Sequence, residues 1–420
     1  MKVRGLPGSG AGLMWAAAGA FLIWIAASGF TIVALRAQSD PSAMMDVIRE
    51  RFPLLVALVV AAAPLGLTAG AVGRIGGPAA GRFSLARALC AGGFAGLAGG
   101  WAFGKWMEQA GFFPLVAGLI RSDSAMVGAT LHFLIAGIIG ATFGLLFQRE
   151  IRGLGSSLAW GAAYGIVWWF VGALTLLPLL TGHRPDWTYA HAAVLFGSLV
   201  GHIVYGLIVG LFYAAVDGAW TWLFERSDPL NREIEGSGVS ALSALLRGAA
   251  ASLLGGLLFS LVMLATGTLP RVARLVGGTS PVLGFAVHLI IGALIGATYG
   301  LLFHHEATDG RAAVAWGSLY GLCWWFLGPL TLFPILLGGT FTWTTAAASA
   351  QLPSLLGHLM YGIALALAFR ALERRHLQEL FVDERLHRRW ERRRRPAGTS
   401  APAVWLFFIG TSVVLPIILG

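Results

Sequence analysis

The chain has 420 residues, of which 57% are hydrophobic and 11% are charged, and its formal net charge is +10. Soluble globular proteins carry about 25% charged residues, so this composition excludes an ordinary soluble domain and indicates an all-α, polytopic membrane protein. The hydrophobic stretches are about 20 residues long, which is the length that a helix needs to cross the bilayer core.

Eleven segments are hydrophobic enough to be predicted as transmembrane helices. In chain order they cover residues 13–35, 54–73, 86–107, 125–147, 157–181, 191–216, 242–265, 281–303, 313–337, 346–370 and 403–419. The last segment is the shortest, so the predicted fold is a bundle of about eleven helices.

A long internal repeat organises these segments. Residues in its two copies are identical at positions that differ by 156, as His132 and His288 do, without a gap. A period of this length is too long for a short solenoid repeat, and it indicates a helical module that was copied once. Each copy holds four predicted spans, an even number, so the two modules are expected to be parallel repeats related by an axis along the membrane normal.

The repeat and the charged stretches divide the chain into six parts. We predict N-terminal transmembrane helices in 1–85, a first four-helix module in 86–216, a linker in 217–241, a second four-helix module in 242–370, a basic cytoplasmic segment in 371–402, and a C-terminal hydrophobic helix in 403–420.

The basic residues predict topology and lipid partners. Most of the 29 Lys and Arg residues fall on the side of the N-terminus, and an excess of these residues marks the cytoplasmic side. Because they lie in loops and one tail, no nucleic-acid surface is expected. The run RRHLQELFVDERLHRRWERRRR is expected to contact anionic headgroups of the bilayer or to act only as a topology anchor. Assembly into a homo-oligomer or a membrane complex is left open.

Polar residues within the predicted spans are the candidate site, because ionisable groups inside a membrane are rare and often functional. Four histidines lie there, two in each module, and tyrosine follows the second one at i+3. A further stripe places Tyr, Trp and Thr at i, i+4 and i+11 on the preceding span. The candidates for a pathway or ligand site are His132, His202, His288, His358, Tyr205, Tyr361, Tyr164, Tyr320, Trp168, Trp324, Thr175 and Thr331.

Three interpretations of these residues stay open. They can be structural, because polar groups often hydrogen-bond across membrane helices. They can form a polar pathway that passes or senses protons or a small solute, without a cofactor and without buried charge. Alternatively, His132, His202, His288 and His358 can supply axial ligands to haem b in an electron-transfer subunit. The chain has no Ser-His-Asp pattern, HExxH motif or phosphate loop, so we do not expect an enzyme, and no metal site is predicted.

The runs HFLIAGIIGATFGLLF, WWFVGALTLLP and LVGHIVYG resemble the YagU-like family of bacterial inner-membrane proteins. The resemblance covers one module at a time, so the chain would be a tandem duplication with extra helices at both ends. It implies a location in the bacterial inner (plasma) membrane and a suspected role in acid tolerance, without an established substrate. The family pattern falls on His132 and His202 and on their copies.

Overall fold

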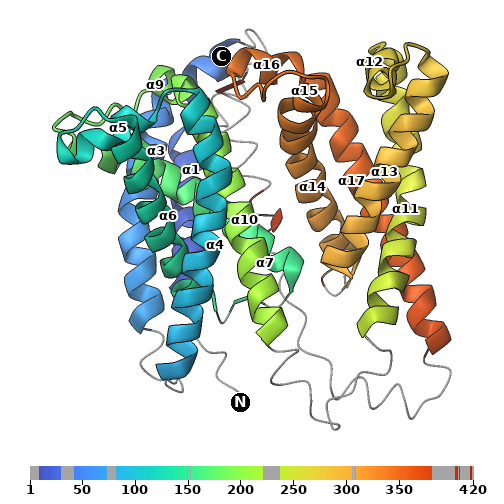
Figure 1. The fold of residues 1–420 in the computed structure, drawn as a ribbon, viewed down its shortest axis with the longest axis horizontal. Coiled ribbons are helices and arrows are strands. Elements are labelled where there is room, and N and C mark those ends of the chain that lie inside the picture. The colour runs from blue at the N-terminus through green and yellow to red at the C-terminus, as the bar shows by residue number, and fades with distance from the viewer. Residues whose placement is uncertain are drawn as a thin grey trace. The chain divides into compact units, whose positions relative to one another are not determined.

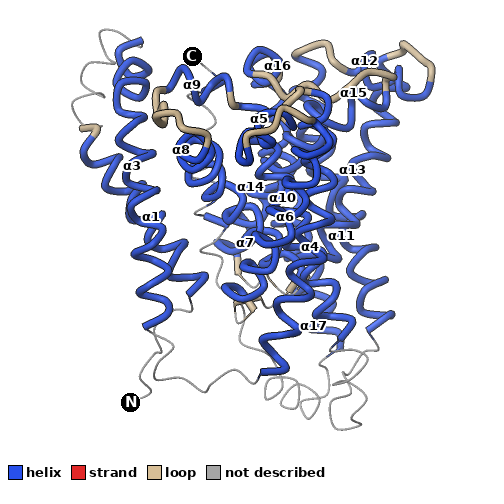
Figure 2. Tube along the Cα trace, turned by 60° about the vertical axis from the view of Figure 1, so that its left-hand side comes forward, coloured by secondary structure: helices blue, strands red, loops and turns tan. Residues whose placement is uncertain are grey.

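The computed structural model describes residues 9–29, 42–72, 82–148, 150–151, 153–220, 237–304, 306, 309–380, 403–404, 406 and 417–418. Every element in these residues is a helix, and no strand occurs in this described part of the chain (Figure 2). The chain divides into two compact units, which are Met1–Gly218 with Phe408–Gly420, and Ala219–Phe407.

Unit 1 contains an N-terminal helix pair and a larger group of helices (Figure 1). The pair is α1 (Ser9–Ala27) and α3 (Ser42–Val72), which pack together. The long helices that follow are α4 (Arg82–Gln109), α6 (Ala125–Phe147), α7 (Leu154–Trp168) and α10 (Phe196–Trp220). The shorter elements are α5 (Phe113–Ala117), the 3-10 turn η1 (Gly118–Ile120), the π-helix η2 (Trp169–Leu176), α8 (Leu177–Leu180) and α9 (Tyr189–Val194).

Unit 2 contains the same order of elements, without a counterpart of the α1–α3 pair among its described residues. Its long helices are α11 (Ser237–Ala265), α13 (Pro281–Phe303), α14 (Gly310–Leu327) and α17 (Leu352–Leu380). The shorter elements are α12 (Leu269–Ala273), the 3-10 turn η5 (Arg274–Val276), the π-helix η6 (Gly328–Leu332), α15 (Phe333–Leu336) and α16 (Thr345–Ala350). Both ends of α13 lie 156 residues after the ends of α6.

Seven helical segments are long and apolar enough to cross a membrane. They are Ala125–Phe147, Leu154–Leu180, Phe196–Trp220, Gly238–Ala265, Pro281–Phe303, Gly310–Leu336 and Leu352–Gln378. The chain thus has the helices of a multi-pass membrane protein, whereas the predicted count of about eleven is not confirmed. The predicted span 86–107 lies within α4, whose middle is rich in glycine and whose ends carry Arg87 and Lys105.

Several predicted boundaries differ from the observed ones. Helix α1 ends at Ala27, and residues 30–35 of the first predicted span lie outside the described part. The predicted span 191–216 is two helices, because the backbone leaves the helical conformation at Leu195 between α9 and α10. Helix α17 continues to Leu380, so the described start of the predicted basic segment is helical. Residues 381–402 and most of 403–420 lie outside the described residues.

Glycines allow the long helices to approach one another closely. A Cβ atom at Gly161 of α7 would overlap the carbonyl oxygen of Gly206 of α10, and a Cβ at Gly206 would overlap that of Gly161. Gly317 of α14 and Gly362 of α17 show the same mutual contact in unit 2. Small residues give such close helix contacts in membranes, where dispersion forces between the backbones stabilise the pair.

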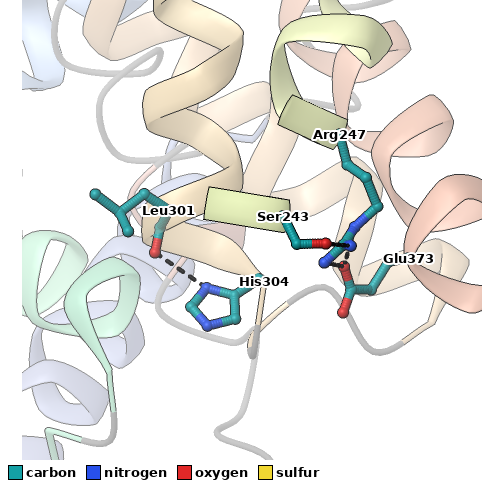
Figure 3. Close-up of polar contacts among 5 residues, drawn as sticks. All are labelled: Ser243, Arg247, Leu301, His304 and Glu373. Atoms are coloured by element: carbon teal, nitrogen blue, oxygen red, sulfur yellow. Dashed lines mark hydrogen bonds and ion pairs between the residues drawn. The ribbon is translucent and has the colours of Figure 1, made fainter. Parts of the chain in front are cut away.

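An ion pair joins α4 to α10 in unit 1, and another joins the equivalent helices α11 and α17 in unit 2. In unit 1, Arg87 Nη2 lies 3.0 Å from Asp217 Oδ1. In unit 2, Arg247 Nη2 lies 2.8 Å from Glu373 Oε2 (Figure 3). Arg247 also donates to the Ser243 hydroxyl on its own helix. The ion pairs therefore tie α4 to α10 and α11 to α17.

Candidate functional site

A phenyl ring bridges the two predicted histidines of unit 1. The ring centroid of Phe103, on α4, lies 5.7 Å from that of His132 on α6 and 4.8 Å from that of His202 on α10. Among the ring contacts of the described residues, Phe103 is the neighbour that both imidazoles share. Three helices that are distant in the sequence thus supply one histidine–phenylalanine–histidine arrangement.

Unit 2 repeats this arrangement with Phe259 of α11. Its ring centroid lies 5.1 Å from that of His288 on α13 and 4.6 Å from that of His358 on α17. The two histidines predicted for each module therefore belong to one site in their own unit. His132 and His288 are each only 8% exposed, so both imidazoles are buried among the helices of their unit.

Each imidazole is held by a backbone carbonyl. His132 Nε2 donates to Gly100 O at 2.9 Å, and His288 Nε2 donates to Gly256 O at 3.2 Å. A carbonyl oxygen only accepts hydrogen bonds, so this nitrogen carries the proton in the neutral ring and Nδ1 is left as the acceptor. The carbonyl bond thus fixes both the tautomer and the ring orientation.

The second histidine of each pair uses its other nitrogen. Nδ1 of His202 lies 2.8 Å from Ser198 O, and Nδ1 of His358 lies 2.8 Å from Ser354 O, one turn earlier on the same helix. Nε2 is therefore the acceptor in the neutral ring. In unit 2 this nitrogen faces the π-helix η6, because a Cβ atom at Gly328 would lie 3.5 Å from it.

The tyrosines at i+3 bond across helices. Tyr205 donates its hydroxyl to Ala136 O on α6 at 2.7 Å, and Tyr361 donates to Gly292 O on α13 at 2.6 Å. These hydroxyls have carbonyl partners and hold α10 to α6 and α17 to α13. These interhelical hydrogen bonds are what the structural interpretation of the two tyrosines predicts.

The other predicted tyrosines bond to threonines that the sequence analysis did not select. Tyr164 Oη lies 2.6 Å from Thr142 Oγ1, and Tyr320 Oη lies 2.7 Å from Thr298 Oγ1. Each tyrosine also donates to a carbonyl on the facing helix, that of Ile139 in unit 1. These contacts place hydroxyl pairs between α6 and α7 and between α13 and α14.

The predicted stripe of Tyr, Trp and Thr separates in space. Trp168 does contact Tyr164, with ring centroids 6.2 Å apart. Thr175, however, lies in the π-helix η2, where it donates to Phe170 O at 2.9 Å and accepts from Trp187 Nε1 at 3.1 Å. A π-turn holds more residues than an α-turn, so the i+11 position rotates away from the first two.

Unit 2 shows the same separation. Trp324 contacts Tyr320, with ring centroids 6.2 Å apart. Thr331 lies in η6, donates to Phe326 O at 2.9 Å, and accepts from Trp343 Nε1 at 2.9 Å. Single π-turns in helices frequently occur at functional sites, and here they lie on the span that carries Trp168 or Trp324.

The two phenylalanines that contact both histidines were not among the predicted site residues. Phe103 and Phe259 are related by the same offset of 156 residues as the histidines, and this retention was the available signal. This retention did not single out the phenylalanines, because an apolar side chain on a glycine-rich span is usually explained by packing alone. Ser198 and Ser354 carry the same signal.

The residues around the histidines bear on the haem alternative. Two axial histidines need a flat slot between their imidazoles for the macrocycle. Here Phe103 contacts both rings, and His132 Nε2 is engaged by Gly100 O. The arrangement in each unit does not fit a haem held between its two histidines, because the phenyl ring would have to leave first. No group of three or more His, Cys, Asp or Glu that could hold a metal ion occurs in the described residues.

Comparison with known proteins gives no relative for this chain: no family model, no curated protein and no solved structure matches it.

Proposed function

We propose that the protein passes or senses protons or a small solute across a membrane. The observation that carries this proposal is the histidine–phenylalanine–histidine arrangement that occurs in both units. Each neutral imidazole keeps one nitrogen as an acceptor, and histidine exchanges protons near physiological pH when unperturbed. The proposed role is non-enzymatic and includes a contribution to acid stress, as in the YagU-like proteins that the sequence resembles.

The proposed setting is the bacterial inner membrane with a cytoplasmic N-terminus. It is supported by seven apolar helical segments and by the excess of Lys and Arg on one side of the predicted topology. In this arrangement the predicted basic segment faces anionic headgroups. The proposal that the two modules are copies of one helical unit is supported by hydrogen bonds that recur at the same offset, such as Tyr205 to Ala136 and Tyr361 to Gly292. Their even number of predicted spans predicts parallel copies.

Proton flux in proteoliposomes tests the proposal. The double variant His202→Leu/His358→Leu removes one imidazole from each unit, and leucine is favourable in a bilayer, by about 0.3–0.6 kcal/mol on insertion scales. We expect flux that depends on pH, measured at about pH 5 and about pH 8 on either side of the ordinary histidine pKa, to be lost in this variant. His183→Leu is the matched control, because His183 lies in the exposed loop after α8.

A visible absorption spectrum of the same samples tests the haem alternative. A Soret band that disappears in the double variant would favour haem and overturn the proposal. Wild-type flux in the double variant would show that the histidines are packing residues.

A further inference from the structure

We propose that Phe103 and Phe259 are aromatic gates, each of which blocks proton transfer between the two imidazoles of its unit until the phenyl ring moves. This inference rests on the proposed function. It extends the site to residues on α4 and α11, and it assigns these phenylalanines a role other than packing.

The first support is the position of the ring. Phe103 is 7% exposed and contacts both imidazoles, whereas no direct ring contact between His132 and His202 is found in the described structure. Phe259 is 9% exposed and likewise contacts both imidazoles of unit 2. A phenyl ring has no donor or acceptor for a proton relay, so the one ring that both imidazoles contact cannot itself pass a proton from one to the other.

The second support is the surface on which each ring lies. A Cβ atom at Gly201 would overlap the ring of Phe103, and a Cβ at Gly357 would overlap the ring of Phe259. Each phenyl therefore packs directly on the backbone of the helix that carries the second histidine. Glycine at this position leaves the ring room next to His202 or His358.

The third support is the polar lining that the ring covers. Removal of Phe103 would open space beside two imidazoles that are anchored to the carbonyl oxygens of Gly100 and Ser198. A buried water needs about two to four polar partners. We expect the imidazole edges that border the opened space to supply such partners, so that the space hydrates and connects the histidines.

Proteoliposome flux with a trapped pH-sensitive dye tests the gate. We expect Phe103→Ala/Phe259→Ala to raise proton flux several-fold, and Phe103→Leu/Phe259→Leu to stay close to the wild-type rate because leucine still fills the space. Adding His202→Leu/His358→Leu to the alanine variant should remove the extra flux. Phe147→Ala/Phe303→Ala is the matched control, since these two phenyls are also buried and related by the repeat. Their rings contact Trp160 and Tyr164, or Trp316 and Tyr320, and no ring contact joins them to the histidines in the described residues.

Chemical labelling gives a second readout that does not depend on transport. Diethyl pyrocarbonate acylates accessible imidazoles, and mass spectrometry reports its reaction at His202 and His358. We expect labelling at both positions to increase in the alanine variant and not in the control variant. If alanine at both positions prevents folding, Phe103→Val/Phe259→Val opens a smaller space and should give the same direction of change.

The outcomes separate the gate from the proposed function. Unchanged flux and unchanged labelling in folded alanine variants would overturn the gate, even where wild-type flux depends on the histidines. Increased labelling without histidine-dependent flux in any variant would overturn the proposed function, while the shielding of the imidazoles by the phenyl ring would stand. An equal rise in flux in the Phe147→Ala/Phe303→Ala control would also overturn the gate, because the loss of any buried phenyl ring would then raise the flux.

Discussion

Arg87 and Arg247 form equivalent ion pairs although they are not at equivalent positions of the repeat. The offset of 156 residues places the equivalent of Arg87 at Ser243, four residues before Arg247. Their partners, Asp217 and Glu373, are at equivalent positions. Four residues are about one helical turn, so the arginine moved along its helix face while the contact was kept. Retention of the contact rather than the position indicates that this pair stabilises the helices.

The two ion pairs are expected to contribute different amounts. The side chains of Arg247 and Glu373 are 13% and 15% exposed, against 28% and 35% for Arg87 and Asp217. Breaking a buried pair costs about 3–5 kcal/mol, whereas exposed pairs contribute about 0–1 kcal/mol. Glu373→Gln should therefore lower the unfolding free energy in detergent more than Asp217→Asn does. Equal losses, or a larger loss with Asp217→Asn, would contradict this ranking.

An aromatic pair that occurs in both units carries its hydroxyl on a different ring in each unit. Phe143 and Tyr213 of unit 1 correspond to Tyr299 and Phe369 of unit 2, and both pairs are T-shaped, with centroids 5.8 and 5.6 Å apart. The Tyr299 hydroxyl is buried and has no hydrogen-bond partner in the described structure. An unsatisfied buried group costs about 1–3 kcal/mol.

Tyr299→Phe should therefore leave thermal stability in detergent unchanged or raise it. The reciprocal change Phe143→Tyr places a new hydroxyl at the equivalent position of unit 1 and should lower stability. A clear loss of stability in Tyr299→Phe would show that this hydroxyl has a partner in the membrane.

Each proposed pathway is complete within one unit, so single histidine variants should act independently. His202→Leu and His358→Leu should each remove about half of the proton flux, because contributions of distant, independent sites add. Flux by each single variant and by the double variant, measured on the same preparation, checks this. Loss of all flux in either single variant would instead require one route that uses both units.

The start of α14 should respond to acid. Asp309 accepts a hydrogen bond from the Ala312 amide at 2.8 Å, and this bond lowers the pKa of the carboxyl below its ordinary value. A lowered folded pKa means that the cap stabilises the folded state above the ordinary pKa of about 3.9 and that this contribution is lost as pH falls through the folded value.

Amide protection in the first turn of α14 should therefore fall as the pH drops below the ordinary pKa of an aspartate carboxyl. Asp309→Asn keeps the cap and should remove this pH dependence. Helix α7 is an internal control, because Gly153 stands at the equivalent position and bonds with the Ser156 side chain instead. Acid-dependent loss of protection at α7 of the same size would assign the effect to general unfolding.

The helical class, most of the apolar spans and the candidate histidines could be predicted from the amino-acid sequence. In a bilayer the backbone must satisfy its own hydrogen bonds, so a hydrophobic run of sufficient length is enough to predict a helix. The offset of 156 residues also predicted that His132 and His202 have equivalents in the second half.

The groups that these histidines contact could not be predicted from the sequence and are set by the packing of the helices. Phe103 reaches both imidazoles because α4, α6 and α10 converge around it, and no local pattern in the sequence encodes that neighbour. Thr175 in the π-helix likewise accepts a hydrogen bond from Trp187, which lies in a loop twelve residues later. Hydrophobic length is a property of one segment, whereas side-chain neighbours arise from packing between helices that the linear order does not fix.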